Sequence, residues 1–118
     1  MQRKILVATA NQQEAEQIEE ILTEFLEKGG ELLWAKKRDE ALRLLKESKP
    51  QILFLDNALV GKSDEWLVGN TQIILIRNIE DNAMHGEDFV DRPLKKEQVM
   101  AKCHATFESL TVARLPPM

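Results

Sequence analysis

The chain has 118 residues, of which 43% are hydrophobic and 31% are charged, and its formal net charge is -4. This length corresponds to one domain, and the hydrophobic content supports a packed core and excludes a disordered chain. The negative charge argues against a nucleic-acid-binding surface, which needs clustered Lys and Arg. The single cysteine excludes an internal disulfide, and no apolar run approaches the length of a membrane helix. We therefore expect a cytoplasmic domain without nucleic-acid or membrane contacts.

Apolar runs of strand length alternate with segments of helical periodicity, which is the pattern of a parallel sheet built from βα units. The five predicted strands centre on residues 5–8, 32–35, 52–55, 73–76 and 89–90. A first helix is predicted between the first two strands, with Asn11 as its cap and Gly29 and Gly30 at its end. Two further helices are predicted, one starting near Asp39 and one over residues 95–110.

Two of the predicted crossovers are short. The segment after the third strand has room for a short helix over residues 64–68, with Ser63 as its cap and Gly69 at its end. Residues 78–87 have room for a single helical turn. The predicted fold class is therefore α/β, a doubly wound five-stranded parallel sheet of flavodoxin-like order 2-1-3-4-5 with shortened third and fourth helices. The domain is predicted to span residues 1–112, with a tail over 113–118.

Candidate site residues gather at one edge of this sheet. In a doubly wound sheet, ligands bind at the carboxyl ends of the strands beside the point where the strand order reverses, here between the first and third strands. Asp56 ends the third strand, which is apolar throughout and therefore predicted to be central. Thr9 and Ala10 follow the first strand, and Arg77 and Arg92 follow the fourth and fifth. These five side chains are expected to line one cleft.

Four stretches of the sequence resemble the receiver domains of two-component response regulators, and together they span nearly the whole chain. They are KILV at 4–7, DEAL at 39–42, PQILFLD at 50–56 and DFVDRPL at 88–94. The third is the most specific, because it joins a buried strand to a terminal aspartate. The resemblance implies that Asp56 stands at the phosphoacceptor position, with a histidine kinase as phosphoryl donor and Mg²⁺ held by this aspartate and an acidic pair.

The chain departs from the family pattern around that aspartate. Thr9 and Ala10 stand in place of the acidic pair, Arg77 replaces a Thr or Ser, and Arg92 replaces a Lys. With Asp56, these positions carry one carboxylate and two guanidinium groups, a net charge of +1, against -2 in the family. Mg²⁺ prefers carboxylate oxygens, so neither a metal site nor a cofactor is expected unless Asp56 is a working phosphoacceptor. Ala58, two residues after the aspartate, is expected to line the same cleft.

Several interpretations of this cleft remain open. In the first, Arg77, Arg92 or both pair with Asp56, and the chain is a non-enzymatic pseudo-receiver that signals by binding a protein, such as a histidine kinase or a downstream regulator. In the second, Asp56 is a functional phosphoacceptor, and in the third the ion pair is only structural. A separate alternative is a flavodoxin-like domain that binds a small anion or nucleotide at the positive cleft.

Four other residues were candidates for chemistry or binding. Cys103 lies on the apolar stripe of the last helix and is expected in the core rather than as a nucleophile. His85 and His104 lack a metal-ligand spacing and are expected at the surface. Trp66 is expected to pack on the sheet, with exposure at a protein interface as the alternative.

A protein-binding surface, including a homodimer interface, is predicted beside the fourth and fifth strands. The short crossover over residues 78–87 cannot cover this part of the sheet with a full helix. We therefore expect parts of Ile74, Ile76, Phe89 or the final helix to be exposed there, and contiguous apolar patches mark interaction sites. In the opposite case, Ile79 and Met84 would fold down and seal the sheet.

Overall fold

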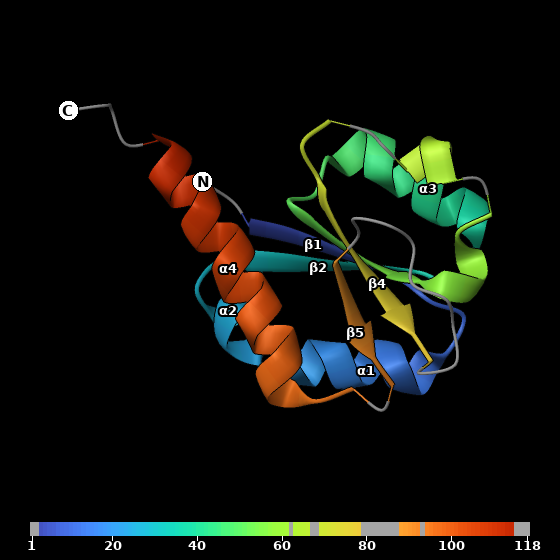
Figure 1. Cartoon of the computed structure of the whole chain (residues 1–118), viewed down its shortest axis with the longest axis horizontal. Coiled ribbons are helices and arrows are strands. Elements are labelled where there is room, and N and C mark those ends of the chain that lie inside the picture. Colours follow the sequence, from blue (N-terminus) through green and yellow to red (C-terminus); the bar gives the residue numbers. More distant parts are fainter. Residues whose placement is uncertain (1–2, 62, 67–68, 79–87, 93, 115–118) are drawn as a thin grey trace.

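In the computed structural model, the chain forms a five-stranded parallel sheet with helices on both faces (Figure 1). The structure describes residues 3–61, 63–66, 69–78, 88–92 and 94–114, and for 63–64, 88 and 108–114 it describes the backbone alone. The strand order is β2-β1-β3-β4-β5, so the predicted fold class is confirmed.

The elements follow the predicted alternation of strand and helix. The strands are β1 (Arg3–Ala8), β2 (Gly30–Ala35), β3 (Ile52–Asp56), β4 (Gln72–Arg77) and β5 (Asp88–Asp91). The helices are α1 (Gln12–Ile21), α2 (Thr23–Glu27), α3 (Arg38–Ser48) and α4 (Lys96–Arg114), with 3-10 turns η1 (Asn57–Leu59) and η2 (Ser63–Trp66). Helix α4 continues past residue 112, where the domain was predicted to end. Within the described residues, no helix combines the length and hydropathy needed to cross a membrane.

Two apolar clusters hold the helices on the sheet, one on each face. The first lies under α1, α2 and α4, and the second lies under α3 and the 3-10 turns (Figure 1). Successive residues of β1 alternate between the two clusters, as strand geometry requires: Ile5 faces the first and Leu6 the second. All five residues of β3 are buried, so this strand is central and carries Asp56 to the middle of the carboxyl edge.

The first helical segment differs from its prediction in one respect. Asn11 caps α1 as expected, because its side chain accepts a hydrogen bond from the Glu14 N–H at 3.2 Å. The predicted single helix is interrupted after Ile21, where the Thr23 hydroxyl lies 2.9 Å from the Glu20 carbonyl oxygen and donates to it. Such bonding to a preceding carbonyl bends helices. The predicted end at two glycines is also wrong in part, because Gly30 already begins β2.

The third crossover folds into two short turns. Residues 64–66 of the predicted helix over 64–68 belong to the 3-10 turn η2, and residues 67–68 lie outside the described part of the chain. Trp66 is 1% exposed, and its indole N–H donates to the Val60 carbonyl at 2.6 Å. The prediction that it packs on the sheet is confirmed, and the interface alternative is wrong. A turn of only four residues can still bury an indole because the carbonyl satisfies its single donor.

The remaining predictions concern the last helix and its surroundings. Cys103 is fully buried in the first cluster, as predicted. His104 is exposed and lies against the Phe25 ring, with the ring centroids 5.0 Å apart, whereas His85 lies outside the described residues.

The expected exposure of Ile74 and Ile76 is wrong. Both are fully buried, because they face the first apolar cluster, which includes Val99 of α4. Phe89 is half-buried, and the Arg77 guanidinium carbon lies 3.4 Å from the centre of its ring. The crossover residues 79–87, with Ile79 and Met84, lie outside the described residues.

Candidate functional site

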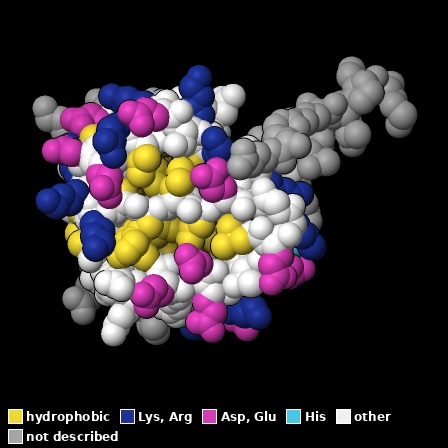
Figure 2. Space-filling view, turned by 180° about the vertical axis from the view of Figure 1, so that it is seen from behind, with side chains coloured by type: hydrophobic (Ala, Val, Ile, Leu, Met, Phe, Trp, Pro, Cys, Tyr) yellow, Lys and Arg dark blue, Asp and Glu magenta, His cyan; other side chains and the backbone are white. Residues whose placement is uncertain are grey.

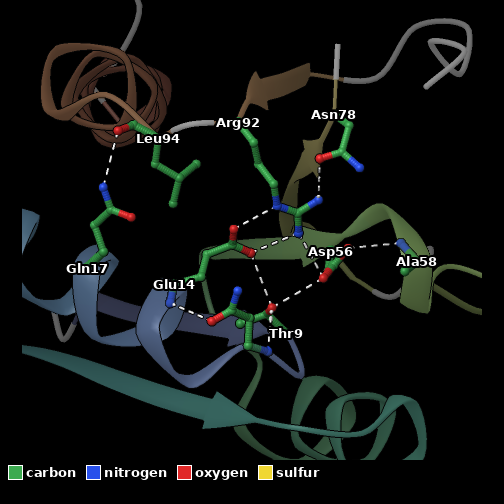
Figure 3. Close-up of polar contacts among 9 residues, drawn as sticks. Thr9, Glu14, Gln17, Asp56, Ala58, Asn78, Arg92 and Leu94 are labelled. Carbon is green, nitrogen blue, oxygen red and sulfur yellow. Dashed lines mark hydrogen bonds and ion pairs between the residues drawn. The ribbon is translucent and has the colours of Figure 1, made fainter. Parts of the chain in front are cut away.

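Asp56 lies at the carboxyl end of β3 and is only 8% exposed. Its Oδ1 accepts a hydrogen bond from the Ala58 backbone N–H at 3.0 Å, which fixes the carboxylate at the start of η1. Its Oδ2 lies 3.2 Å from the Thr9 hydroxyl and 2.9 Å from the Arg92 Nη2 (Figure 3). Both carboxylate oxygens therefore already have partners within the chain.

Arg92 follows β5 and reaches across the cleft to two carboxylates. Its Nε lies 2.7 Å from Glu14 Oε2 and its Nη2 lies 2.9 Å from Glu14 Oε1, so it binds Glu14 through two hydrogen bonds (Figure 3). The same Nη2 contacts Asp56, and Nη1 lies 3.4 Å from Asn78 Oδ1. Its backbone N–H donates to the Arg77 carbonyl at 2.8 Å, which fixes the residue beside β4. The predicted ion pair between Arg92 and Asp56 is therefore present.

Glu14, which the sequence analysis missed, completes this cluster from the first turn of α1. It is 7% exposed, and the Thr9 hydroxyl lies 3.2 Å from its Oε1. Two signals in the sequence could have identified it. It stands three residues after the capping Asn11, where acidic residues are favoured, and four before Ile18, on the apolar stripe. A carboxylate on such a stripe needs a buried partner.

Thr9 joins the two carboxylates. Its hydroxyl has one proton, so it donates to Glu14 or to Asp56 at any one time, while its oxygen accepts the Asn11 N–H at 3.1 Å. Ala10 and Ala58 are exposed at the rim, and neither side chain offers a polar group.

Arg77 does not pair with Asp56. It lies opposite Asp91 in the pairing of β4 with β5, and its Nε lies 2.8 Å from the Asp91 Oδ1. The cleft's charge therefore differs from the predicted +1. Two carboxylates, Glu14 and Asp56, and one guanidinium give a net charge of -1, and Arg77 is neutralised separately by Asp91.

Arg92 stays charged in this environment. Its pKa is raised above the ordinary arginine value, mainly by the hydrogen bond to Glu14 and further by Asp56, while burial opposes the shift. The ion pairs are therefore not weakened by loss of the arginine proton at any pH at which a protein of this kind folds.

A magnesium site of the receiver type does not fit these side chains. Mg²⁺ needs oxygen ligands arranged octahedrally, and the acidic pair that would supply them is replaced by Thr9 and Ala10. The two carboxylates that are present both bind the guanidinium, which lies between them (Figure 3). Across the described part of the chain, no group of three His, Cys, Asp or Glu side chains could hold a metal ion.

The sequence matches no protein-family model and no curated protein. Its structure, however, is similar to many solved structures. The signal receiver domain of a putative LuxO repressor from Vibrio parahaemolyticus superposes with a TM-score of 0.74 at 13% identity, covering 96% of this chain and 95% of that one. A two-component response regulator from Clostridium difficile gives 0.73 at 21% identity, covering 92% and 98%. The chain has the fold of a response-regulator receiver domain.

One of the similar structures belongs to a protein that is much longer than this chain. The Brucella abortus protein NtrX, solved in complex with ADP, matches with a TM-score of 0.75 at 20% identity, over 97% of this chain and 28% of that one. The TM-scores of 0.73 to 0.75 establish the shared fold, and at identities of 13% to 21% the likeness extends to the fold alone. The chemistry of the cleft depends on its own side chains.

Proposed function

We propose that this chain is a receiver-like signalling domain in which an internal arginine occupies the phosphorylation cleft. We call Arg92, with Glu14 and Asp56 as its partners, the arginine clamp. The domain acts by binding a protein partner, a histidine kinase or a downstream regulator, and its phosphorylation is impaired or absent. One observation carries the proposal: a single guanidinium group contacts both buried carboxylates of the cleft at 2.7 to 2.9 Å.

The clamp lowers the reactivity of Asp56 in two ways. An aspartyl oxygen can attack a phosphoryl group only if it can leave its own hydrogen bonds, and here one oxygen accepts the Ala58 N–H while the other contacts Arg92. The incoming phosphoryl group and the Glu14 carboxylate are both negatively charged and would compete for the same guanidinium. The phosphoryl group would therefore have to displace Glu14 from Arg92.

Phosphoryl transfer also needs a cation to neutralise charge in the transition state. The guanidinium supplies one positive charge, but it is already balanced by two carboxylates, so the cleft has no net positive charge to offer. The alternative of an anion- or nucleotide-binding domain depended on a positively charged cleft. Because the cleft has no net positive charge, this alternative loses its support.

The clamp also holds separate parts of the fold together, which favours a signalling surface that stays in one state, either active or inactive. Glu14 belongs to α1, Asp56 to β3, and Arg92 to the segment after β5, so the clamp joins three separate parts of the fold. Breaking it exposes or leaves unpaired two nearly buried carboxylates, which is costly. The surface around the cleft therefore keeps one arrangement, and a partner recognises that arrangement without a phosphorylation signal.

Incubation with acetyl phosphate and Mg²⁺, followed by intact-mass measurement, tests this proposal. The wild-type chain should gain no phosphate. The variant with Thr9→Asp, Ala10→Asp and Arg92→Lys should gain one phosphate, and adding Asp56→Asn should abolish the gain. A wild-type mass increase that Asp56→Asn removes would show a functional phosphoacceptor instead.

A second comparison separates the clamp from a purely structural ion pair. The variant with Thr9→Asp and Ala10→Asp alone restores the acidic pair but keeps Arg92. If the clamp blocks the site, this variant stays unphosphorylated until Arg92→Lys is added. Equal phosphorylation of the two variants would show that the arginine contributes stability only.

A further inference from the structure

The sheet has two edges, and they differ in how well they are protected. The β5 edge is four residues long, with an aspartate at each end, and Arg92 follows it directly. Charged, short edges of this kind resist pairing with another chain. The β2 edge is six residues long, and its centre is Leu32-Leu33-Trp34. In the described structure β2 pairs with β1 on one side and has no strand on the other.

The backbone groups on the open side of β2 can be assigned from the ladder. Thr9 N–H donates to the Ala35 carbonyl at 3.0 Å, so the backbone groups of Ala35 point toward β1. The direction of these backbone groups alternates along a strand. The N–H and C=O of Leu33 therefore also point toward β1, whereas those of Leu32 and Trp34 point away from the sheet edge into the open. After the strand, the Lys36 N–H donates to the Glu40 carboxylate at 3.0 Å, so the open part of this edge ends before Lys36.

The side chains of β2 add apolar surface on both faces of the sheet at this edge. Leu32 and Trp34 are half-buried against the first core cluster, and Leu33 is half-buried against the second. On the side of the molecule turned away in Figure 1, exposed apolar side chains form two rows, with acidic and basic side chains around them (Figure 2). An open edge with apolar residues above and below favours strand addition.

We propose that β2 is a dimerisation strand, and that its partner is the β2 strand of a second copy, paired antiparallel about a two-fold axis at Leu33. In this register Leu32 of each copy lies opposite Trp34 of the other. Both residues point their backbone groups outward, so each pair exchanges two hydrogen bonds. The two Leu33 side chains meet at the axis, and the two sheets join into one of ten strands, twice the five strands of the single chain.

The charges at the two ends of β2 favour this partner over an unrelated peptide. The acidic Glu31 lies at one end, and the basic Lys36 and Lys37 lie at the other. An antiparallel copy brings the acidic end of one strand beside the basic end of the other. Glu31 of one copy then lies beside the Lys36 and Lys37 end of the other copy, just beyond the paired residues, and symmetry makes this approach twice.

Sedimentation velocity over a range of concentrations, with the wild-type chain and single variants, tests the proposal. We expect a monomer–dimer equilibrium in the wild type. Leu33→Lys should abolish the dimer, because it places two like charges opposite each other at the axis. Ala101→Lys is the matched control, since it adds the same single positive charge at an exposed position of α4 and should leave association unchanged. Circular dichroism confirms that each variant is folded.

Charge reversal tests the register. Glu31→Lys alone and Lys37→Glu alone should each weaken the dimer about tenfold, because each turns two attractions between opposite charges into repulsions. The double variant should recover most of the lost affinity. In the wild type, dimerisation should also slow hydrogen exchange at the Leu32 and Trp34 amides and leave the Leu33 amide unchanged, since that amide is bonded to β1 in the monomer.

A chain that remains monomeric at the highest concentration would overturn the proposal. A dimer that survives Leu33→Lys, or that forms without slower exchange at Leu32 and Trp34, would also overturn it and would favour the surface beside β4 and β5. The proposal is independent of the arginine clamp, so Asp56→Asn should dimerise as the wild type does.

Discussion

Replacing Arg92 by glutamine should destabilise the fold more than any other single loss of an ion pair in the described chain. The substitution removes three contacts of 2.7 to 2.9 Å and leaves Glu14 and Asp56, which are 7% and 8% exposed, without a cation between them. Removing one member of a buried ion pair costs about 3 to 5 kcal/mol. The Arg92 side chain is 24% exposed, so solvent reduces the loss to the lower end, about 3 kcal/mol.

Arg77→Gln is the matched control, because both arginines end or follow neighbouring strands at the same edge of the sheet. Its partner Asp91 is 30% exposed, and water can solvate that carboxylate once the arginine is gone. With the contact of the Arg77 guanidinium to the Phe89 ring included, the expected loss is about 1 to 2 kcal/mol. Urea unfolding at pH 7, followed by tryptophan fluorescence and circular dichroism, measures both values.

A third variant separates lost charge balance from lost packing. Adding Glu14→Gln and Asp56→Asn to Arg92→Gln replaces the buried charges by neutral amides that can bond to one another and to the Thr9 hydroxyl. This triple variant should recover more than half of the stability lost in Arg92→Gln. If Arg92→Gln costs no more than Arg77→Gln, or if the triple variant recovers nothing, the clamp does not hold the cleft as described.

Three further predictions concern the rest of the fold. Asn11→Ala should lower the free energy of unfolding by about 1 kcal/mol in urea, because it removes the cap of α1. Trp66→Phe should cost about 1 to 2 kcal/mol in the same assay, because it removes the indole donor to Val60. Burial raises the pKa of the Cys103 thiol to about 12 from 9.0, so the folded state keeps a proton that the unfolded state loses. The free energy of unfolding should therefore fall as pH rises above about 9, and Cys103→Ala should remove this loss at alkaline pH. A Cys103 thiol that reacts freely with a thiol reagent in the folded protein would contradict its burial.

The sheet could be predicted because its signals are local. Each strand is a short apolar run, and the fully apolar third run had to be central, which placed Asp56 at the middle of the carboxyl edge. The helix after β1 was less predictable in detail. The break after Ile21 coincides with the hydrogen bond from the Thr23 hydroxyl to the Glu20 carbonyl, and apolar periodicity continues through it.

The cleft was predicted only in part, because ion pairs depend on distances between separate segments. The position of Arg92 after β5 was sufficient to predict its contact with Asp56. The same reasoning failed for Arg77, since the pairing of β4 with β5 places Asp91 directly opposite. Glu14 was missed because only strand ends were considered. Its carboxylate, together with the pairing of Arg77 with Asp91, changes the net charge of the cleft from the predicted +1 to -1.

Titration with Mg²⁺, monitored by the backbone amide resonances of Asn11 and Ala58, tests the central claim most directly. These amides donate to Thr9 and to Asp56, so they would report any cation that binds between the carboxylates. With the guanidinium in that place, the wild-type resonances should not shift at millimolar Mg²⁺, whereas the variant with Thr9→Asp, Ala10→Asp and Arg92→Lys should show saturable shifts. Saturable shifts in the wild type that Asp56→Asn removes would contradict the claim that Arg92 occupies the cleft in place of the metal.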